Sequence, residues 1–205
     1  MPTLAQLKAH LVIAPKIDPR RYLPSILFDG GYTVSTDGHR LLVIQHPGAT
    51  FPKTIVNRES VELAIKSGSK HSDISLEVIL GIARAAGLNP VIDAQYPDAR
   101  RAIPAADALM LDRPMRIMRD HDFGYLGDFQ KVADLLAKAD VPAAGKATTK
   151  GVCELWPNKD ENRASLITFG DKRVEVFGVL MPMRLERAPV ILPNCYTSFM
   201  GGAKK

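Results

Sequence analysis

The chain contains 205 residues, of which 46% are hydrophobic and 24% are charged, and its formal net charge is +5. This length can bury the core of one large domain or of two small ones, and the composition is typical of a soluble globular protein. No stretch approaches the roughly 18 apolar residues of a membrane helix, and the N-terminus lacks the basic and apolar segments of a secretory signal. We therefore expect a cytoplasmic protein without a membrane span.

The cysteines and histidines do not predict a metal site or a cofactor. Cys153 and Cys195 lack C-x-x-C spacing, and the histidines, at positions 10, 39, 46, 71 and 121, show no ligand spacing. We interpret both cysteines as ordinary thiols, with Cys153 buried in a strand, which suits a reducing compartment. The chain also lacks a nucleophile elbow, a Walker loop and the H-E-x-x-H pattern, so we expect no enzymatic activity.

The N-terminal part of the chain predicts a helix followed by a tight β-hairpin. Thr3 can cap a helix over residues 4–12, in which leucines recur at helical spacing. A strand over residues 22–28 follows, and strands over residues 32–35 and 40–45 flank the turn Thr36-Asp37-Gly38-His39. Asp-Gly between apolar runs is a strong hairpin signal, because glycine accepts the positive φ of a tight turn.

The next segment holds a short helix and an ambiguous run. A helix is expected over residues 62–66, started by Asn57 or Ser60. In residues 76–86 the apolar positions fit a helix, yet Leu76-Glu77-Val78-Ile79-Leu80 also fits a strand. The pattern alone slightly favours the helix.

The remaining elements complete a repeated unit. Helix 128–139 carries Phe129 on its apolar face, and residues 99–105 form a connector. Short strands are expected over residues 91–94, 109–111 and 115–118, and longer ones over 152–156, 164–169 and 174–181. This order predicts an α+β fold in which a helix packed on a small antiparallel sheet is repeated, not alternating βαβ units.

Four segments, in this order, resemble the bacterial DNA sliding clamp, the beta subunit of DNA polymerase III. They are Arg21-Tyr22-Leu23-Pro24-Ser25-Ile26-Leu27-Phe28, Thr36-Asp37-Gly38-His39-Arg40-Leu41, Tyr96-Pro97-Asp98-Ala99-Arg100-Arg101-Ala102-Ile103-Pro104 and Val179-Leu180-Met181-Pro182-Met183-Arg184-Leu185. The resemblance implies a clamp-like fold with strands over residues 76–86. It also implies three parts: residues 1–105 as a middle clamp domain, 106–185 as a shortened C-terminal clamp domain, and 186–205 as a C-terminal extension.

In the clamp family, the middle domain and the chain's end line an apolar cleft that binds short peptides of polymerases and repair proteins. The resemblance places Leu23, Thr36, Gly38, His39, Arg40, Leu41, Pro97, Arg101, Ala102, Phe129, Val179, Leu180, Met181, Pro182, Met183 and Arg184 in this cleft. Methionines make adaptable pocket walls, and two apolar anchors would give about 3–6 kcal/mol before ordering costs. We expect weak, exchangeable binding, micromolar at best. The alternative is that Met181 and Met183 are core residues.

The resemblance also implies contact with the DNA phosphate backbone. The expected cations are Lys16, Arg20 and Arg21 in a loop before the first strand, and Arg100 and Arg101 on the connector. Such side chains meet phosphates without reading bases. Three to five contacts predict a log–log salt slope of roughly −3 to −4.5 on duplex DNA.

Three functional hypotheses follow. The first is a replication or repair accessory protein that tethers partners to DNA as a processivity factor, with a homo-oligomer as one of its expected forms. A ring of such protomers would need about three or four copies, by counting domains. The second is a stand-alone peptide-binding adaptor or decoy that does not encircle DNA. The third is an unrelated antiparallel α+β fold with a ligand pocket.

Overall fold

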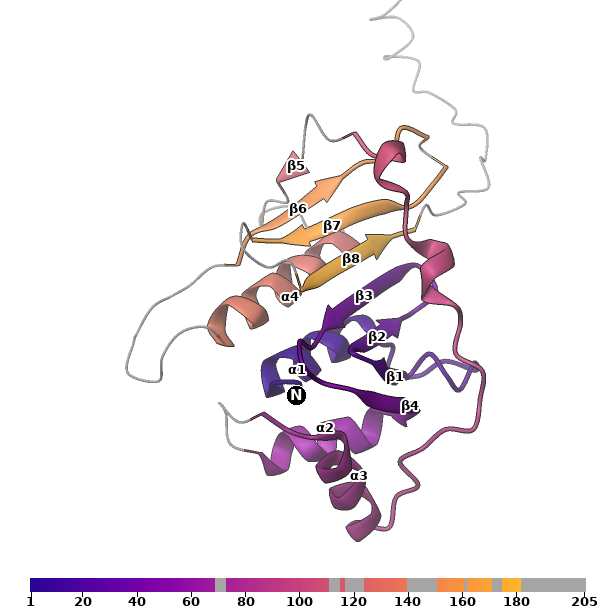
Figure 1. Ribbon diagram of the computed structural model, residues 1–205, viewed down its shortest axis with the longest axis vertical. Helices are drawn as coiled ribbons and strands as arrows, with labels where there is room; N and C mark the ends of the chain where they lie inside the picture. Colours follow the sequence, from indigo (N-terminus) through magenta and orange to yellow (C-terminus); the bar gives the residue numbers. More distant parts are fainter. Residues whose placement is uncertain are drawn as a thin grey trace, which may run out of the picture.

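An eight-stranded antiparallel sheet organises the molecule in this computed structural model (Figure 1). The structure describes residues 1–68, 73–110, 115–116, 124–139, 151–160, 162–170 and 175–181. The helices are α1 (Leu4–Ile13), α2 (Arg58–Ser67), α3 (Leu76–Ala85) and α4 (Tyr125–Ala139), with 3-10 turns η1 (Ala99–Ala102) and η2 (Ala106–Ala108). The strands are β1 (Ser25–Gly30), β2 (Tyr32–Thr36), β3 (Arg40–Gln45), β4 (Phe51–Asn57), β5 (Met115–Arg116), β6 (Cys153–Trp156), β7 (Ser165–Phe169) and β8 (Val176–Leu180).

One sheet carries strands from both halves of the chain. Its strand order is β4-β1-β2-β3-β8-β7-β6-β5, so β3 and β8 join the two halves. They pair antiparallel, with Arg40 opposite Leu180 and Ile44 opposite Val176. The expected α+β class with antiparallel sheet is confirmed. The division at residue 105 stays a prediction, since the sheet itself runs across both halves without a break.

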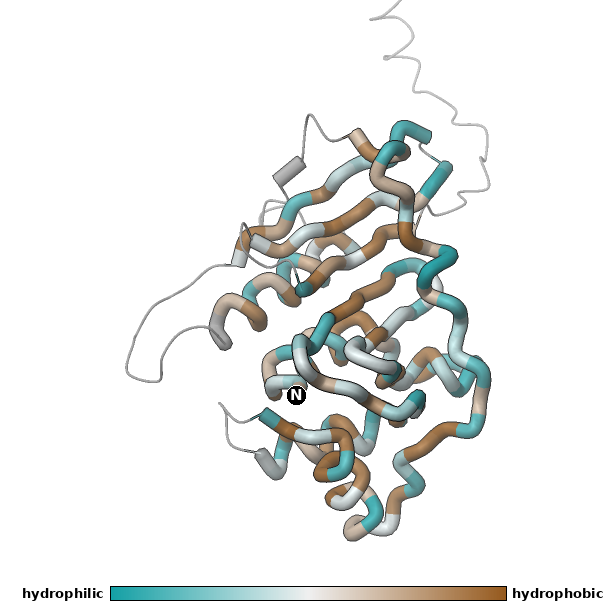
Figure 2. The backbone as a smooth tube through the Cα atoms, in the orientation of Figure 1, coloured by the Kyte–Doolittle hydropathy of each residue, from teal (hydrophilic) through white to brown (hydrophobic). Residues whose placement is uncertain are grey.

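Helices α1 and α4 pack on one face of this sheet, and the connector packs on the other. Leu42 and Ile44 point to one face and pack with Phe129 of α4 and Ile13 of α1. Their neighbours on β3 point to the other face, because successive strand residues alternate, and there they pack with Tyr96 of the connector, which in the structure runs from residue 96 to residue 108. Figure 2 shows the apolar colours concentrated in the central strands and the polar ones in many of the turns.

A third apolar cluster packs α2 and α3 against the β4 end of the sheet. Val61 of α2 and Ile79 of α3 are fully buried there with Phe28 of β1. None of the helices within the described ranges is both long and apolar enough to cross a membrane.

Residues 76–85 form a helix, so the strands implied by the clamp resemblance are wrong here and the apolar pattern was the better guide. The Ser75 side chain accepts a hydrogen bond from the backbone N–H of Val78, which caps the helix. Leu76, Ile79 and Ala83 are buried at helical spacing. Local capping and periodicity therefore prevail over the resemblance in this segment.

Other sequence expectations differ in detail. Strand β4 was not expected, and α2 is longer than predicted, with Asn57 as its N-cap. Val91 and Leu109 make isolated bridges in place of the expected short strands, Val91 to Val56 and Leu109 to Asn158. The helix capped by Thr3 and the hairpin around Gly38 are confirmed.

A buried polar network joins α1 to the sheet. His10 Nδ1 lies 2.8 Å from Ser35 Oγ, and His10 Nε2 lies 2.7 Å from Thr33 Oγ1, which also contacts His46 Nε2 at 2.8 Å. Burial, followed by the charge of His46, lowers the pKa of His10 to about 3, and burial lowers the pKa of His46 to about 4. Both imidazoles are therefore neutral in the folded protein at pH 7.

We predict that acid weakens the fold through His10. Between its ordinary pKa of 6.5 and its folded value of about 3, the unfolded chain binds a proton that the folded protein does not, so stability falls as pH drops. From pH 7 to pH 5 this linkage should cost about 1–2 kcal/mol. Urea unfolding of His10→Gln should show a pH-dependent loss smaller by that amount, while His39→Gln, at an exposed histidine, is the matched control. Identical pH dependence in wild type and His10→Gln would contradict the prediction.

Candidate functional site

The turn of the β2–β3 hairpin lies directly beside the end of β8. The Met181 backbone N–H donates to the His39 carbonyl oxygen at 2.8 Å, continuing the ladder between β3 and β8. Within the turn, Asp37 Oδ1 accepts from the backbone N–H groups of His39 and Arg40, and Gly38 adopts a φ of 92°. The turn is therefore fixed by its own hydrogen bonds and holds its tip against β8.

The connector between the two halves covers the sheet next to this junction. Tyr96 is buried, and its ring packs edge-on against Tyr22, with the two ring centres 6.2 Å apart. Its hydroxyl lies 3.4 Å from the Val34 carbonyl oxygen. Asp98 caps the turn η1 that follows, through a hydrogen bond from the Arg100 backbone N–H. This anchoring brings Ala102 onto the apolar cluster formed by the middle strands.

The loop between β6 and β7 forms the opposite wall. Asn158 Nδ2 donates to the Ala164 carbonyl oxygen at 3.0 Å, and Asn158 Oδ1 accepts from the Asp160 backbone N–H at 3.0 Å. The loop is also tied to the connector, because the Lys159 backbone N–H donates to the Ala108 carbonyl oxygen at 2.9 Å. Both walls are thus held by backbone hydrogen bonds.

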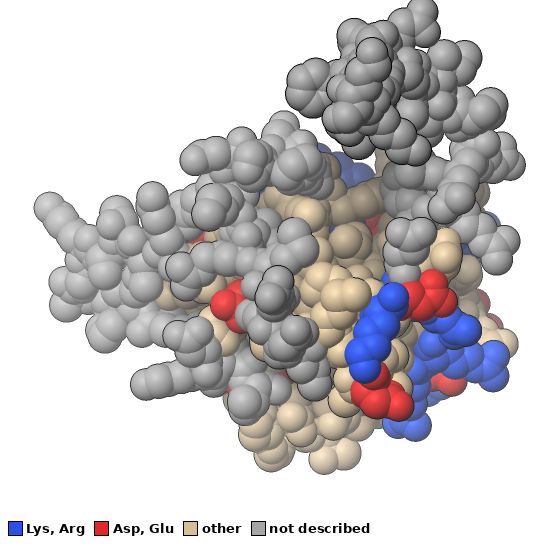
Figure 3. Space-filling view, turned by 90° about the horizontal axis from the view of Figure 1, so that it is seen from above, with Lys and Arg blue, Asp and Glu red and all other residues tan. Residues whose placement is uncertain are grey.

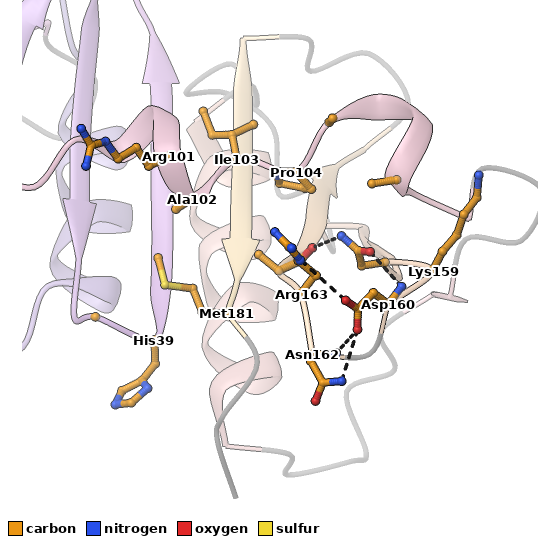
Figure 4. Close-up of a pocket in the computed structure, with 15 residues that line it drawn as sticks. His39, Arg101, Ala102, Ile103, Pro104, Lys159, Asp160, Asn162, Arg163 and Met181 are labelled. Atoms are coloured by element: carbon orange, nitrogen blue, oxygen red, sulfur yellow. Dashed lines mark hydrogen bonds and ion pairs between the residues drawn. The ribbon is translucent and has the colours of Figure 1, made fainter.

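A pocket of about 910 Å³ lies between these walls (Figure 4). Its volume is within the range of ligand sites in proteins. It is lined by Gly38, His39, Arg101, Ala102, Ile103, Pro104, Ala105, Ala108, Asn158, Lys159, Asp160, Asn162, Arg163, Ala164 and Met181. The lining combines small and apolar side chains with a few charged ones.

The charged side chains belong mainly to the loop wall. Arg163 Nε lies 3.6 Å from Asp160 Oδ2, and the Lys159 ammonium donates to the Asp107 carbonyl oxygen at 2.7 Å. The hydrogen bond from the Asn162 backbone, with further help from Arg163, holds the pKa of Asp160 below its ordinary value. Asp160 is therefore a carboxylate at neutral pH. Among the described residues, no group of three His, Cys, Asp or Glu is placed to hold a metal ion.

The structure brings together some of the cleft residues expected from the sequence. Five of them line the pocket: Gly38, His39, Arg101, Ala102 and Met181. Four more are buried: Leu23, Thr36, Leu41 and Val179. Of these, Leu41 and Val179 belong to the cluster on which Ala102 and Ala164 pack. Pro97 is exposed and not part of the lining, and Pro182, Met183 and Arg184 lie outside the described residues.

Three expected cleft residues lie on the helical side of the sheet instead. Phe129 is fully buried against Gly178, where an added methyl group would stand only 2.5 Å from its ring. Leu180 packs on the same cluster as Phe129. Arg40 points toward α4, where it is bound by two carboxylates. The sequence order of these residues could not tell which face of the sheet each side chain takes.

Arg40 links the hairpin to helix α4. Its guanidinium pairs with Asp37 at 2.8 Å and with Asp128, and lies 4.7 Å from the centre of the Tyr125 ring, on which His39 also stacks. Burial alone would raise the pKa of Asp128, but hydrogen bonds from Lys131 and Arg40 outweigh it and lower this pKa. Arg40 is therefore a structural cation of the hairpin and not a rim residue of the pocket.

The expected DNA-contacting cations are exposed. Lys16, Arg20 and Arg21 lie in the loop before β1, and Arg100 and Arg101 lie on η1. Arg20 pairs with Asp18 at 2.9 Å, and Arg101 lies 3.5 Å from Asp98. On the described part of the face drawn in Figure 3, blue basic side chains also stand next to red acidic ones.

The pocket also contains residues that the sequence analysis missed. They are Ile103, Pro104, Ala105 and Ala108 of the connector, and Asn158, Lys159, Asp160, Asn162, Arg163 and Ala164 of the loop between β6 and β7. A signal for the loop was available, since in an antiparallel sheet the start of β7 lies at the same end as the finish of β8. Ser165 is in fact opposite Leu180.

We predict that Arg40→Met lowers the free energy of unfolding by about 2–4 kcal/mol, because two carboxylates lose their buried cation. Lys131→Met is the control, since Lys131 bonds the same Asp128 carboxylate at 2.8 Å but is 70% exposed. An exposed pair of this kind should be worth at most about 1 kcal/mol. Urea unfolding at pH 7 measures both variants, and equal losses would contradict the central role of Arg40.

The comparisons with known proteins identify the fold. No family model and no curated protein matches the chain. Among solved structures, the DNA polymerase III subunit beta of Borrelia burgdorferi matches with a TM-score of 0.55 and 11% identity, over 90% of this chain and 63% of that chain. The sliding clamp of Pseudomonas aeruginosa matches with a TM-score of 0.51 and 17% identity, over 89% and 65%.

The beta clamp of Helicobacter pylori, bound to a DNA ligase peptide, matches with a TM-score of 0.51 and 15% identity, over 89% of this chain and 63% of that chain. The chain therefore spans less than two thirds of the length of these clamps. The resemblance noted in the sequence is confirmed at the level of structure. The protein has the fold of the bacterial DNA sliding clamps.

Proposed function

We propose that the protein is a non-catalytic docking factor that binds short peptides of DNA polymerases or repair proteins and tethers them to DNA. The observation that carries this proposal is the pocket where the hairpin tip, the end of β8 and the connector meet. The Helicobacter pylori clamp, which shares this fold, was crystallised with a DNA ligase peptide. A peptide is thus a ligand of the kind that such a fold accepts.

The chemistry of the pocket suits a small apolar anchor. Met181 and Ile103 offer apolar surface, and Met181 can adapt to side chains of different shape. Each buried anchor side chain contributes about 1.5–3 kcal/mol, from which the ordering of the peptide must be subtracted. Binding should be micromolar or weaker and should exchange rapidly.

The DNA contact rests on the exposed cations near the hairpin. An added methyl group at Gly38 would lie 3.5 Å from Arg20 Nη1, so the loop of residues 16–21 adjoins the turn that lines the pocket. Lys16, Arg21 and Arg100 make no ion pair within 4 Å among the described residues. They are the side chains best placed to meet phosphates.

The second candidate function is a peptide-binding adaptor or decoy that does not encircle DNA. The pairing of Arg20 with Asp18 and the closeness of Arg101 to Asp98 favour it, because a cation that already has a carboxylate gains less from a phosphate. Retention on circular and linear DNA separates the two functions. A ring is lost from linear DNA through its ends, whereas an adaptor behaves alike on both.

We predict that a fluorescently labelled clamp-binding peptide binds the wild-type protein and that Met181→Ala weakens this binding at least about fivefold, or 1 kcal/mol. Fluorescence anisotropy measures both affinities. Met110→Ala is the matched control, because Met110 is 42% exposed and does not line the pocket. Its affinity should stay within about twofold of the wild type. A wild-type protein that binds no such peptide would refute the pocket as a docking site.

We predict that duplex DNA binding weakens with salt at a log–log slope of about −2.7, for three phosphate contacts at about −0.9 each. The variant Lys16→Gln/Arg21→Gln/Arg100→Gln should abolish this slope. The control Lys53→Gln/Lys66→Gln/Arg84→Gln removes the same charge from exposed sites on β4, α2 and α3 and should keep it. Anisotropy titrations of a labelled duplex at several salt concentrations provide the measurement. Equal slopes for the two variants would contradict the assignment of the contacts.

A further inference from the structure

The lining of the pocket includes charged side chains that an apolar anchor would not pair with. Three of the lining side chains are cationic, Arg101, Lys159 and Arg163, against one carboxylate, Asp160. The net charge of these four side chains is thus +2. An occupant with acidic groups would complement it.

The apolar side chains and the cations of the loop lie on different sides of the pocket. Figure 4 shows Met181 near Ala102 of η1, with Arg101 beside Ala102, while Lys159, Asp160 and Asn162 lie on the loop wall and Arg163 lies between them and Met181. An extended peptide laid along the pocket would therefore meet the two groups in sequence.

The cations remain available for an incoming carboxylate. The Lys159 ammonium has one hydrogen bond, to the neutral Asp107 carbonyl oxygen, and an ammonium has three donors. Arg163 is 76% exposed and its Nε lies 3.6 Å from Asp160, which leaves most of its five donors unused by that carboxylate. Charge-assisted hydrogen bonds to such groups are stronger than neutral ones.

The backbone carrying these cations is fixed in place. The Arg163 backbone N–H donates to the Asp160 carbonyl oxygen at 2.9 Å, and the Lys159 backbone N–H donates to Ala108 of the connector, also at 2.9 Å. A preorganised wall loses less entropy when a ligand binds than a loose loop would.

We propose that the peptide bound by this pocket carries one or more acidic residues beside its apolar anchor, and that Lys159 and Arg163 select them. The inference rests on the proposed peptide-docking function and names the chemical class of the partner. Because the cations are exposed, the gain is modest: an acidic peptide should bind about three- to tenfold more tightly than its neutral counterpart at low salt. High salt should reduce this preference.

The test compares two labelled peptides with the same apolar residues, one with Asp and Glu in its flank and one with Asn and Gln. Anisotropy at low salt should show the three- to tenfold preference in the wild type and its loss in Lys159→Gln/Arg163→Gln. The control Lys53→Gln/Arg84→Gln removes the same charge from exposed sites outside the pocket and should keep the preference. Thermal unfolding checks that both variants keep the wild-type stability.

The outcomes separate this inference from the proposed function. Equal binding of both peptides by the wild type would overturn the acidic preference and leave peptide docking intact. A preference that persists in Lys159→Gln/Arg163→Gln, or that disappears in the control variant, would overturn the assignment to these two residues. If neither peptide binds, the docking function fails together with the inference.

Discussion

The antiparallel pairing of β3 with β8 is the constraint on which the rest of the molecule depends. It joins strands far apart in the sequence into one sheet, and it sets the hairpin tip beside the end of β8 through the bond from Met181 to His39. The position of the loop between β6 and β7 depends on β8 as well, because β7 pairs with the edge of β8 that faces away from β3. Without this pairing the pocket would have no second wall, and α4 would lose the surface on which Phe129 packs.

The same register divides two tasks between the faces of the sheet. Along β8, Gly178 accommodates the ring of Phe129 on the helical face, while Val179 lies on the connector face with Leu41. At the hairpin, Arg40 is turned toward Asp128 of α4, and the ring of His39, which also borders the pocket, stacks on Tyr125 of the same helix. A substitution of Arg40 therefore changes the pocket only through the position of the hairpin.

Local signals in the sequence predicted local structure well. The Thr3 cap, the hairpin at Gly38 and the apolar face of α4 each depend on residues within a few positions of one another. The resemblance to clamps found the overall fold but failed at α3, where Ser75 and helical periodicity decide. The face taken by Phe129 or Arg40 depends on which layer covers each side of the sheet, and that is a property of the tertiary structure. The wall formed by residues 158–160 and 162–164 was missed although the antiparallel pairing of β7 with β8 places it beside the end of β8.

The small side chains of the pocket bear on how such a protein would work. Ala102, Ala105 and Ala108 offer few methyl and methylene groups to a ligand, so the apolar part of the pocket can contribute only modest free energy. In the proposed docking function, discrimination among partners would then come from the polar wall, where unpaired or mismatched charges weigh more than a missing methylene. A docking site of this kind exchanges partners readily, since weak complexes dissociate quickly. Tethering to a common DNA would raise the local concentration of such partners, which is how weak contacts become effective.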